Sequence, residues 1–176
     1  MKNYFILGLG CLVLLFSSCR DDVGELLFEL NYPPRTFSLP AGTNTFTAAV
    51  FSANNLPTSY PDFLASSGHS AGDVNSIIPN FARLESQDGL DIGFLSEISL
   101  RICPINEPNC TVADEAFYID DLYRRNITGT GLQPGLNDFK ELLSGNLYKI
   151  EVVFFLAEIA PYTVDFRLDY GFRAYR

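Results

Sequence analysis

The sequence predicts an all-β fold: an antiparallel β-sandwich, immunoglobulin-like or jelly-roll-like, with one short helix. Three observations lead to this prediction. Apolar and polar residues alternate along most of the chain, which is the period of a strand with one buried and one wet face. Turn signals rich in Pro and Gly separate these stretches. Convincing helix signals occur only once, which disfavours an alternating α/β sheet.

The expected strands follow from this alternation in chain order. The first covers residues 25–32 and the second covers residues 45–52, where Phe46, Ala48 and Val50 share one face. A turn at residues 40–42 separates the two. The fold therefore needs seven or more strands. The others are expected at residues 76–84, 93–102, 116–120, 147–156 and 163–175.

The single expected helix covers residues 138–144. Asn137 can cap it, Asp138 suits the positive end of the helix dipole, and Gly145 stands where a helix ends. The helix would bridge two strands. The last two strands, joined around Ala160 and Pro161, are expected to pair as a closing β-hairpin. A chain truncated after Pro161 should therefore be unfolded.

Residues 53–75 do not alternate and are rich in Ser, Pro, Gly and Asn. Long loops inside compact domains are often functional, so this segment is a candidate binding loop, with Tyr60, Phe63 and His69 as its candidate contact residues. The alternative is an insertion that wraps the sandwich edge, with Phe63 and Leu64 as packing residues. Both interpretations remain open at this stage.

The N-terminus has the composition of an export signal. A short positive start with Lys2 precedes an apolar stretch at residues 4–16, which is too short to span a bilayer, and then Ser17, Ser18 and Cys19. The pattern from Phe16 to Cys19 resembles the lipobox of bacterial lipoproteins. The resemblance implies that residues 1–18 are removed and that Cys19 is lipidated. An ordinary secretory signal is the alternative.

The residues after Cys19 suggest where the protein is located. Arg20, Asp21 and Asp22 are similar to the export signal of Bacteroidota-type surface lipoproteins. The alternative, of equal weight, is that the two aspartates solvate a tether. We therefore expect a lipid-anchored protein of the cell envelope, on the outer membrane, with surface exposure and a periplasmic orientation as the two alternatives. Residues 19–24 would form the lipidated tether, and residues 25–176 would form a single β-sandwich domain.

The chain is acidic, with a net charge of −9 and a sequence pI near 4.4. Nucleic-acid binding needs clustered Lys and Arg, so that partner is excluded. The same charge argues against attraction to anionic lipids, so membrane attachment must come from the acyl chains. Cys103 and Cys110 bracket a turn-rich segment and are expected to form a disulfide in an oxidising compartment. A zinc site is the rival, but it lacks ligands.

No complete catalytic constellation is evident. His69 is the only histidine, no nucleophile elbow precedes a helix, and no phosphate or dinucleotide loop is present, so neither a cofactor nor a metal is predicted. The leading hypothesis is a non-enzymatic envelope binding or assembly module with a protein or glycan partner. The alternative is a hydrolase of extracellular glycans or peptides that uses paired carboxylates. The candidate pairs, which could also bind calcium, are Asp88 with Asp91, Asp114 with Glu115, and Asp120 with Asp121.

Overall fold

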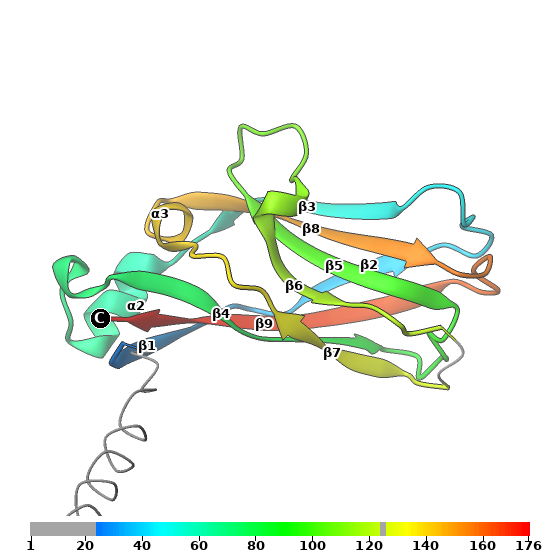
Figure 1. Cartoon of the computed structure of the whole chain (residues 1–176), viewed down its shortest axis with the longest axis horizontal. Helices are drawn as coiled ribbons and strands as arrows, with labels where there is room; N and C mark the ends of the chain where they lie inside the picture. The colour runs from blue at the N-terminus through cyan, green and yellow to red at the C-terminus, as the bar shows by residue number, and fades with distance from the viewer. Residues whose placement is uncertain (1–23, 124–125) are drawn as a thin grey trace, which may run out of the picture.

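Two antiparallel sheets face each other across one core in the computed structural model, which describes residues 24–123 and 126–176 (Figure 1). The described residues form nine strands. These are β1 (Leu26–Asn31), β2 (Arg35–Leu39), β3 (Ala49–Pro57), β4 (Ser76–Ser86), β5 (Leu95–Cys103), β6 (Glu115–Ile119), β7 (Gly129–Pro134), β8 (Leu147–Leu156) and β9 (Val164–Tyr175). The predicted all-β sandwich is confirmed.

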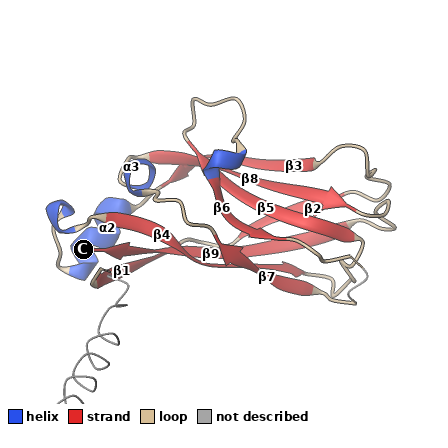
Figure 2. Cartoon of the chain, in the orientation of Figure 1, coloured by secondary structure: helices blue, strands red, loops and turns tan. Residues whose placement is uncertain are grey.

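The strand order shows one closed and one open side of the sandwich. One layer contains β1 and β2, which both pair with β9, followed by β4 and β7; the other contains β6, β5, β8 and β3. Pairing between β6 and β7 joins the layers on one side (Figure 2). On the other side, β2 pairs only with β9 and β3 pairs only with β8. The two layers therefore meet there through side chains alone.

The predicted hairpin of the last two strands is wrong, because β8 and β9 lie in different sheets. Their buried faces instead pack against each other across the core. The Phe154 and Phe166 rings are stacked with centroids 5.2 Å apart, and the Tyr148 and Tyr170 hydroxyls are 2.6 Å apart. Alternation establishes that each strand has one buried face, but it fits face-to-face packing as well as edge pairing.

The strand predicted at residues 45–52 begins later in the structure, and the face opposite to the one that carries Phe46 and Val50 is the buried one. The strand β3 begins at Ala49 rather than residue 45, Phe46 is 93% exposed, and Phe51 points into the core. Both faces of residues 45–52 carry apolar side chains, so the pattern could not select the buried one. The strands β2 and β7 were not predicted, since they have only five and six residues.

The helices are also distributed differently from the prediction. The longest, α2 (Tyr60–Ser67), lies within the expected loop and ends at Gly68, which has a φ of 74°. The expected helix at residues 138–144 is reduced to the single turn α3 (Lys140–Leu143). Asn137 does not cap it, because its amide donates to the carbonyls of Ala113 and Glu115. Two 3₁₀ turns complete the structure: η2 (Ala71–Asp73) and η3 (Val112–Asp114).

Both ends of the described chain lie at the α2 end of the sandwich (Figure 1). There the Arg176 backbone N–H donates to the Glu25 carbonyl at 2.9 Å. The loops at residues 40–48 and 157–163 lie at the opposite end and are tied together, because Gly42 N–H donates to the Ala160 carbonyl at 2.8 Å. Within the described ranges, no helix is both long and apolar enough to cross a membrane. Cys19 lies outside the described residues.

Candidate functional site

The three residues of the candidate binding loop are not gathered into one site. Tyr60 is 6% exposed and its ring lies 6.4 Å from that of Phe28, between centroids. Phe63 packs edge-on against Tyr32 at 5.8 Å, whereas His69 follows the helix and donates its backbone N–H to the Ser67 hydroxyl. The geometry of α2 matches the alternative interpretation, an insertion at the sandwich edge, because Phe63 and Leu64 both pack against the core.

Three of the six carboxylates of the hydrolase hypothesis, Asp91, Asp114 and Glu115, act as acceptors for neighbouring groups of the fold. One Asp91 oxygen accepts the backbone N–H groups of Gly93 and Ile127. Asp114 accepts the backbone N–H and hydroxyl of Thr111, in the capping box of η3. Glu115 accepts the Ser99 hydroxyl at 2.5 Å. Asp114 also borders a hollow of about 260 Å³ beside α3, but its hydrogen bonds there serve the local backbone.

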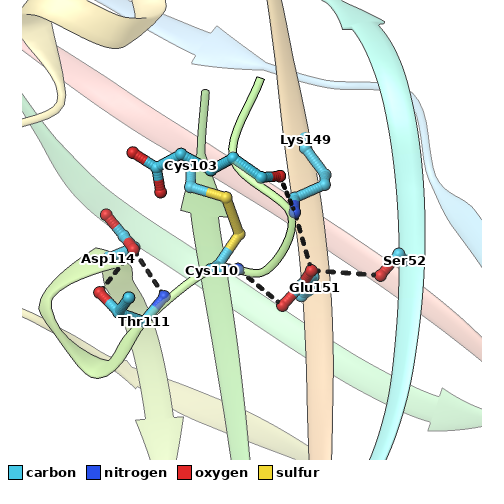
Figure 3. A network of polar contacts seen from close by, with 8 residues as sticks. Ser52, Cys103, Cys110, Thr111, Asp114, Lys149 and Glu151 are labelled. Atoms are coloured by element: carbon cyan, nitrogen blue, oxygen red, sulfur yellow. Dashed lines mark hydrogen bonds and ion pairs between the residues drawn. A yellow bond between two sulfur atoms is a disulfide. The ribbon is translucent and has the colours of Figure 1, made fainter. Parts of the chain in front are cut away.

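A buried polar network covers the outer face of β8 (Figure 3). Alternation makes Lys149 and Glu151 solvent-facing, yet they are only 2% and 3% exposed. The reason is the segment between Cys103 and Cys110, which folds over them. Lys149 Nζ lies 2.9 Å from Glu151 Oε1 and 2.9 Å from the Glu107 carbonyl, and Cys110 N–H donates to Glu151 Oε2 at 3.0 Å. The covering loop thus supplies partners to both buried charges.

The disulfide holds this loop in place. Cys103 and Cys110 are bonded as predicted, with Cα atoms 5.5 Å apart. Glu107 and Asp114 bring carboxylates within 4.8 Å of the Cys103 sulfur, a spacing compatible with a metal site. The Cys103 sulfur is in the disulfide and is not a free thiolate, which leaves two carboxylates. The arrangement is structural.

Replacing both cysteines of the disulfide with alanine should lower the free energy of unfolding by about 2.5 kcal/mol. The reason is that the bond closes a short loop in the unfolded chain and so reduces its entropy. Urea denaturation of the oxidised protein and of Cys103→Ala/Cys110→Ala measures this loss. Cys110→Ala alone serves as the control, since it removes the same bond. An unchanged denaturation midpoint would contradict the prediction.

A pocket lies between β2 and β3 at the open side of the sandwich. Its volume is about 290 Å³, and we call it the β2–β3 pocket. The Phe37 and Phe51 rings stack at its wall with centroids 5.5 Å apart and planes at 22°. It is lined by Pro34, Arg35, Thr36, Phe37, Phe51, Ser52, Ala53, Ile150, Val152 and Leu168, so seven of its ten lining residues are apolar.

Arg35 is the only charged residue in the lining of this pocket. Arg35 alternates with Phe37 and Leu39 along β2, so its side chain points between the sheets. Among the described residues, Arg35 forms no ion pair with a carboxylate, and its Nε is buried without a hydrogen-bond partner. The guanidinium also hydrogen-bonds to the Tyr170 side chain, but that partner is neutral. The partly buried positive charge therefore has no counter-ion among the described residues, which favours an anion beside it.

Three buried tyrosines lie behind Arg35. The Tyr32 ring is 5.4 Å from both the Tyr148 ring and the Tyr170 ring, between centroids. The Tyr32 hydroxyl is buried and has no hydrogen-bond partner. Burial raises the pKa of all three phenols, most strongly that of Tyr148, while the Arg35 guanidinium acts in the opposite direction on Tyr148 and Tyr170. The phenols are therefore neutral hydrogen-bonding groups at physiological pH.

Alkaline titration should show these tyrosines ionising only as the protein unfolds. Their folded pKa values are raised above that of an unfolded tyrosine, which is about 10. The resulting stabilisation is therefore complete below about pH 10 and is lost as the pH rises toward the folded values. Tyrosinate absorbance followed together with circular dichroism measures this coupling. Tyr148→Phe should remove one late-ionising group. Ionisation of Tyr32, Tyr148 and Tyr170 before unfolding would contradict the prediction.

The sequence contains a signal for Arg35 that the prediction missed. Residues 35–39 read Arg-Thr-Phe-Ser-Leu, an alternation that places a charge among inward-facing apolar residues. A charge at such a position is unusual unless it has a partner. The signal went unused because β2 itself was not predicted.

No protein family and no curated protein matches this sequence. Solved structures show only distant likenesses. A structure of Triatoma virus has a TM-score of 0.37 at 9% identity, over 94% of this chain and 71% of that one. A recombinantly expressed latent aurone synthase (polyphenol oxidase) has a TM-score of 0.38 at 10% identity, over 80% and 26%. A Kashmir bee virus empty particle has a TM-score of 0.34 at 11% identity, over 86% and 92%. Such low scores establish no function for this chain.

Proposed function

We propose that this chain is a non-enzymatic binding module of the bacterial cell envelope, held on the outer membrane by lipid attached to Cys19. The support for the anchor comes from the sequence, in which the apolar stretch at residues 4–16 and the following Ser17, Ser18 and Cys19 resemble a lipobox. The net charge of −9 would be repelled by anionic lipids, so acyl chains must provide the attachment.

The observation that carries the binding function is the β2–β3 pocket. It combines an apolar lining of moderate volume with one inward-pointing cation, Arg35, that has no carboxylate partner among the described residues. Ligand pockets commonly have this composition: mostly apolar walls with a few polar groups that fix orientation. The pocket lies along the open side of the sandwich, whereas both ends of the described chain lie at the α2 end.

A pocket-filling variant tests the binding function. Ala53 lines the pocket opposite Ile150 in the β3–β8 register, so Ala53→Leu should fill part of the cavity while leaving the fold intact. The full-length protein is isolated from its own envelope, and the small molecules extracted from it are compared by mass spectrometry. We expect a compound that wild type carries and Ala53→Leu lacks. Identical extracts from the two proteins would refute the pocket as the binding site.

A separate experiment tests the anchor. Cells fed an alkyne fatty acid should label the wild-type protein and should not label Cys19→Ser. Protease treatment of intact cells then tests surface exposure, since a surface protein is digested without lysis. A protein that is digested only after lysis would be on the periplasmic side.

A further inference from the structure

We infer that the β2–β3 pocket binds a small apolar monocarboxylate, with Arg35 binding its carboxylate. The inference rests on the proposed function and adds the chemical class of the ligand. The first reason is charge. In a chain with a net charge of −9, four of the other five described arginines, Arg83, Arg167, Arg173 and Arg176, each contact a carboxylate, and the fifth, Arg101, donates from Nε to the Ser99 hydroxyl. Arg35 contacts none of the described carboxylates, although it points toward the core.

The second reason is the number of charges that the pocket can neutralise. Arg35 is its only cation, and its other polar lining residues are Thr36 and Ser52. The Ser52 hydroxyl already donates to Glu151 Oε1 at 3.3 Å. One guanidinium matches one carboxylate in a bidentate geometry, whereas a dianionic phosphate would keep a buried, unpaired charge. A monoanion is therefore favoured.

The third reason is the shape and size of the apolar part. The ligand body would contact the stacked Phe37 and Phe51 rings and the side chains of Ile150 and Val152. A cavity of about 150 Å³ with such walls accommodates benzene. The β2–β3 pocket has about 290 Å³, which suits a ligand with roughly twice the volume of benzene, such as an arylalkanoic or medium-chain alkanoic acid.

A rival role for Arg35 is protection of the open strand edges. Inward-pointing charges on edge strands discourage edge-to-edge association, and β2 and β3 are both edges. The two roles differ in what removal of the charge does. Loss of a ligand contact weakens carboxylate binding, whereas loss of edge protection produces dimers or larger species with no effect on binding.

Calorimetry with defined probes tests the inference. The full-length lipoprotein in phosphatidylcholine nanodiscs is titrated with 3-phenylpropionate, with its neutral analogue 3-phenylpropan-1-ol and with phenyl phosphate, against empty nanodiscs. The variants are Arg35→Gln, Ala53→Leu and the matched control Arg83→Gln, whose side chain is on the solvent side of β4. We expect wild type and Arg83→Gln to prefer the carboxylate over both other probes. We expect Arg35→Gln to bind it at least about tenfold more weakly.

Each other outcome overturns a defined claim. The ligand class is overturned if wild type binds 3-phenylpropionate and 3-phenylpropan-1-ol with equal affinity. It is also overturned if wild type and Arg35→Gln bind 3-phenylpropionate with equal affinity. The proposed function survives that result if Ala53→Leu still weakens both probes. Preference for phenyl phosphate overturns the monoanion. If no probe binds and Arg35→Gln associates in size-exclusion chromatography, the role of Arg35 is edge protection and the inference is overturned. The comparison of extracts from wild type and Ala53→Leu decides the proposed function separately.

Discussion

A chain that stops after Pro161 is expected not to fold. The truncation removes β9, whose backbone pairs with β1, β2 and β4 and so holds one layer of the sandwich together. Without it, β1 and β2 lose the only strand with which either pairs, and β4 keeps β7 alone. The other layer would then expose the inner faces of β5 and β8 to water.

The side chains of β9 make the loss larger than its length suggests. Its inward-facing residues are fully buried, and they include aromatic rings that contact both layers. Phe166 stacks on Phe154, and Phe172 packs edge-on against Phe117 and Phe139. Replacing one such ring with alanine costs about 3–5 kcal/mol, and a typical domain is stable by only about 5–15 kcal/mol. Removal of the whole strand therefore exceeds the available stability.

Thermal melting followed by circular dichroism checks this expectation. The truncated chain should show no cooperative transition in the melt and no dispersed amide resonances in its NMR spectrum. A chain lacking only Arg176 is the control, because that side chain forms partly exposed ion pairs with Glu25 and Asp73, which contribute little. A cooperative melt of the truncated chain would show that the core forms without β9.

The sequence predicts the individual strands better than their partners. The strand β8 was predicted with its observed bounds because Lys149 and Glu151 alternate with apolar residues in its first half and the rest of the strand, to Leu156, is apolar. Its pairing with β3 and β5, rather than β9, depends on contacts between residues far apart in the chain. Alternation is a local property, so it is compatible with several strand orders.

The candidate site was predicted least well, for a related reason. The β2–β3 pocket combines Arg35 with Phe51 and Val152, which come from three strands of two different sheets. Only the pairing of β2 with β9 and of β3 with β8 brings them to the same open side. The Cys103–Cys110 disulfide was predictable, because both residues and the intervening turn lie within one short segment.

Burial on the outer face of β8 is not evident from the alternating pattern. Lys149 and Glu151 occupy positions that alternation assigns to solvent, and the segment after Cys103 covers them. The sequence contains no local mark of this burial, since a turn-rich segment between two cysteines equally fits a loop that extends into water. Their burial has an energetic consequence that is large enough to measure.

Glu151→Leu should lower the free energy of unfolding by about 3–5 kcal/mol, because it leaves the Lys149 ammonium buried without its counter-charge. Lys149→Met should cost a comparable amount by leaving the Glu151 carboxylate unpaired. Urea denaturation measures both losses. Glu85→Gln is the control, because it breaks an exposed ion pair: the Glu85 side chain is 41% exposed and the Arg83 side chain is 66% exposed. This change should lower the free energy of unfolding by less than about 1 kcal/mol.

The double variant Lys149→Met/Glu151→Leu separates pairing from packing. Exchange of a buried ion pair for apolar residues of similar volume is often neutral or stabilising, so the double variant should recover most of the loss caused by either single change. It does not recover everything, because the Cys110 N–H and the Ser52 hydroxyl lose their acceptor on Glu151. Losses that simply add in the double variant would mean that the two charges do not stabilise each other. In that case the loop between Cys103 and Cys110 would depend on its disulfide and backbone contacts alone.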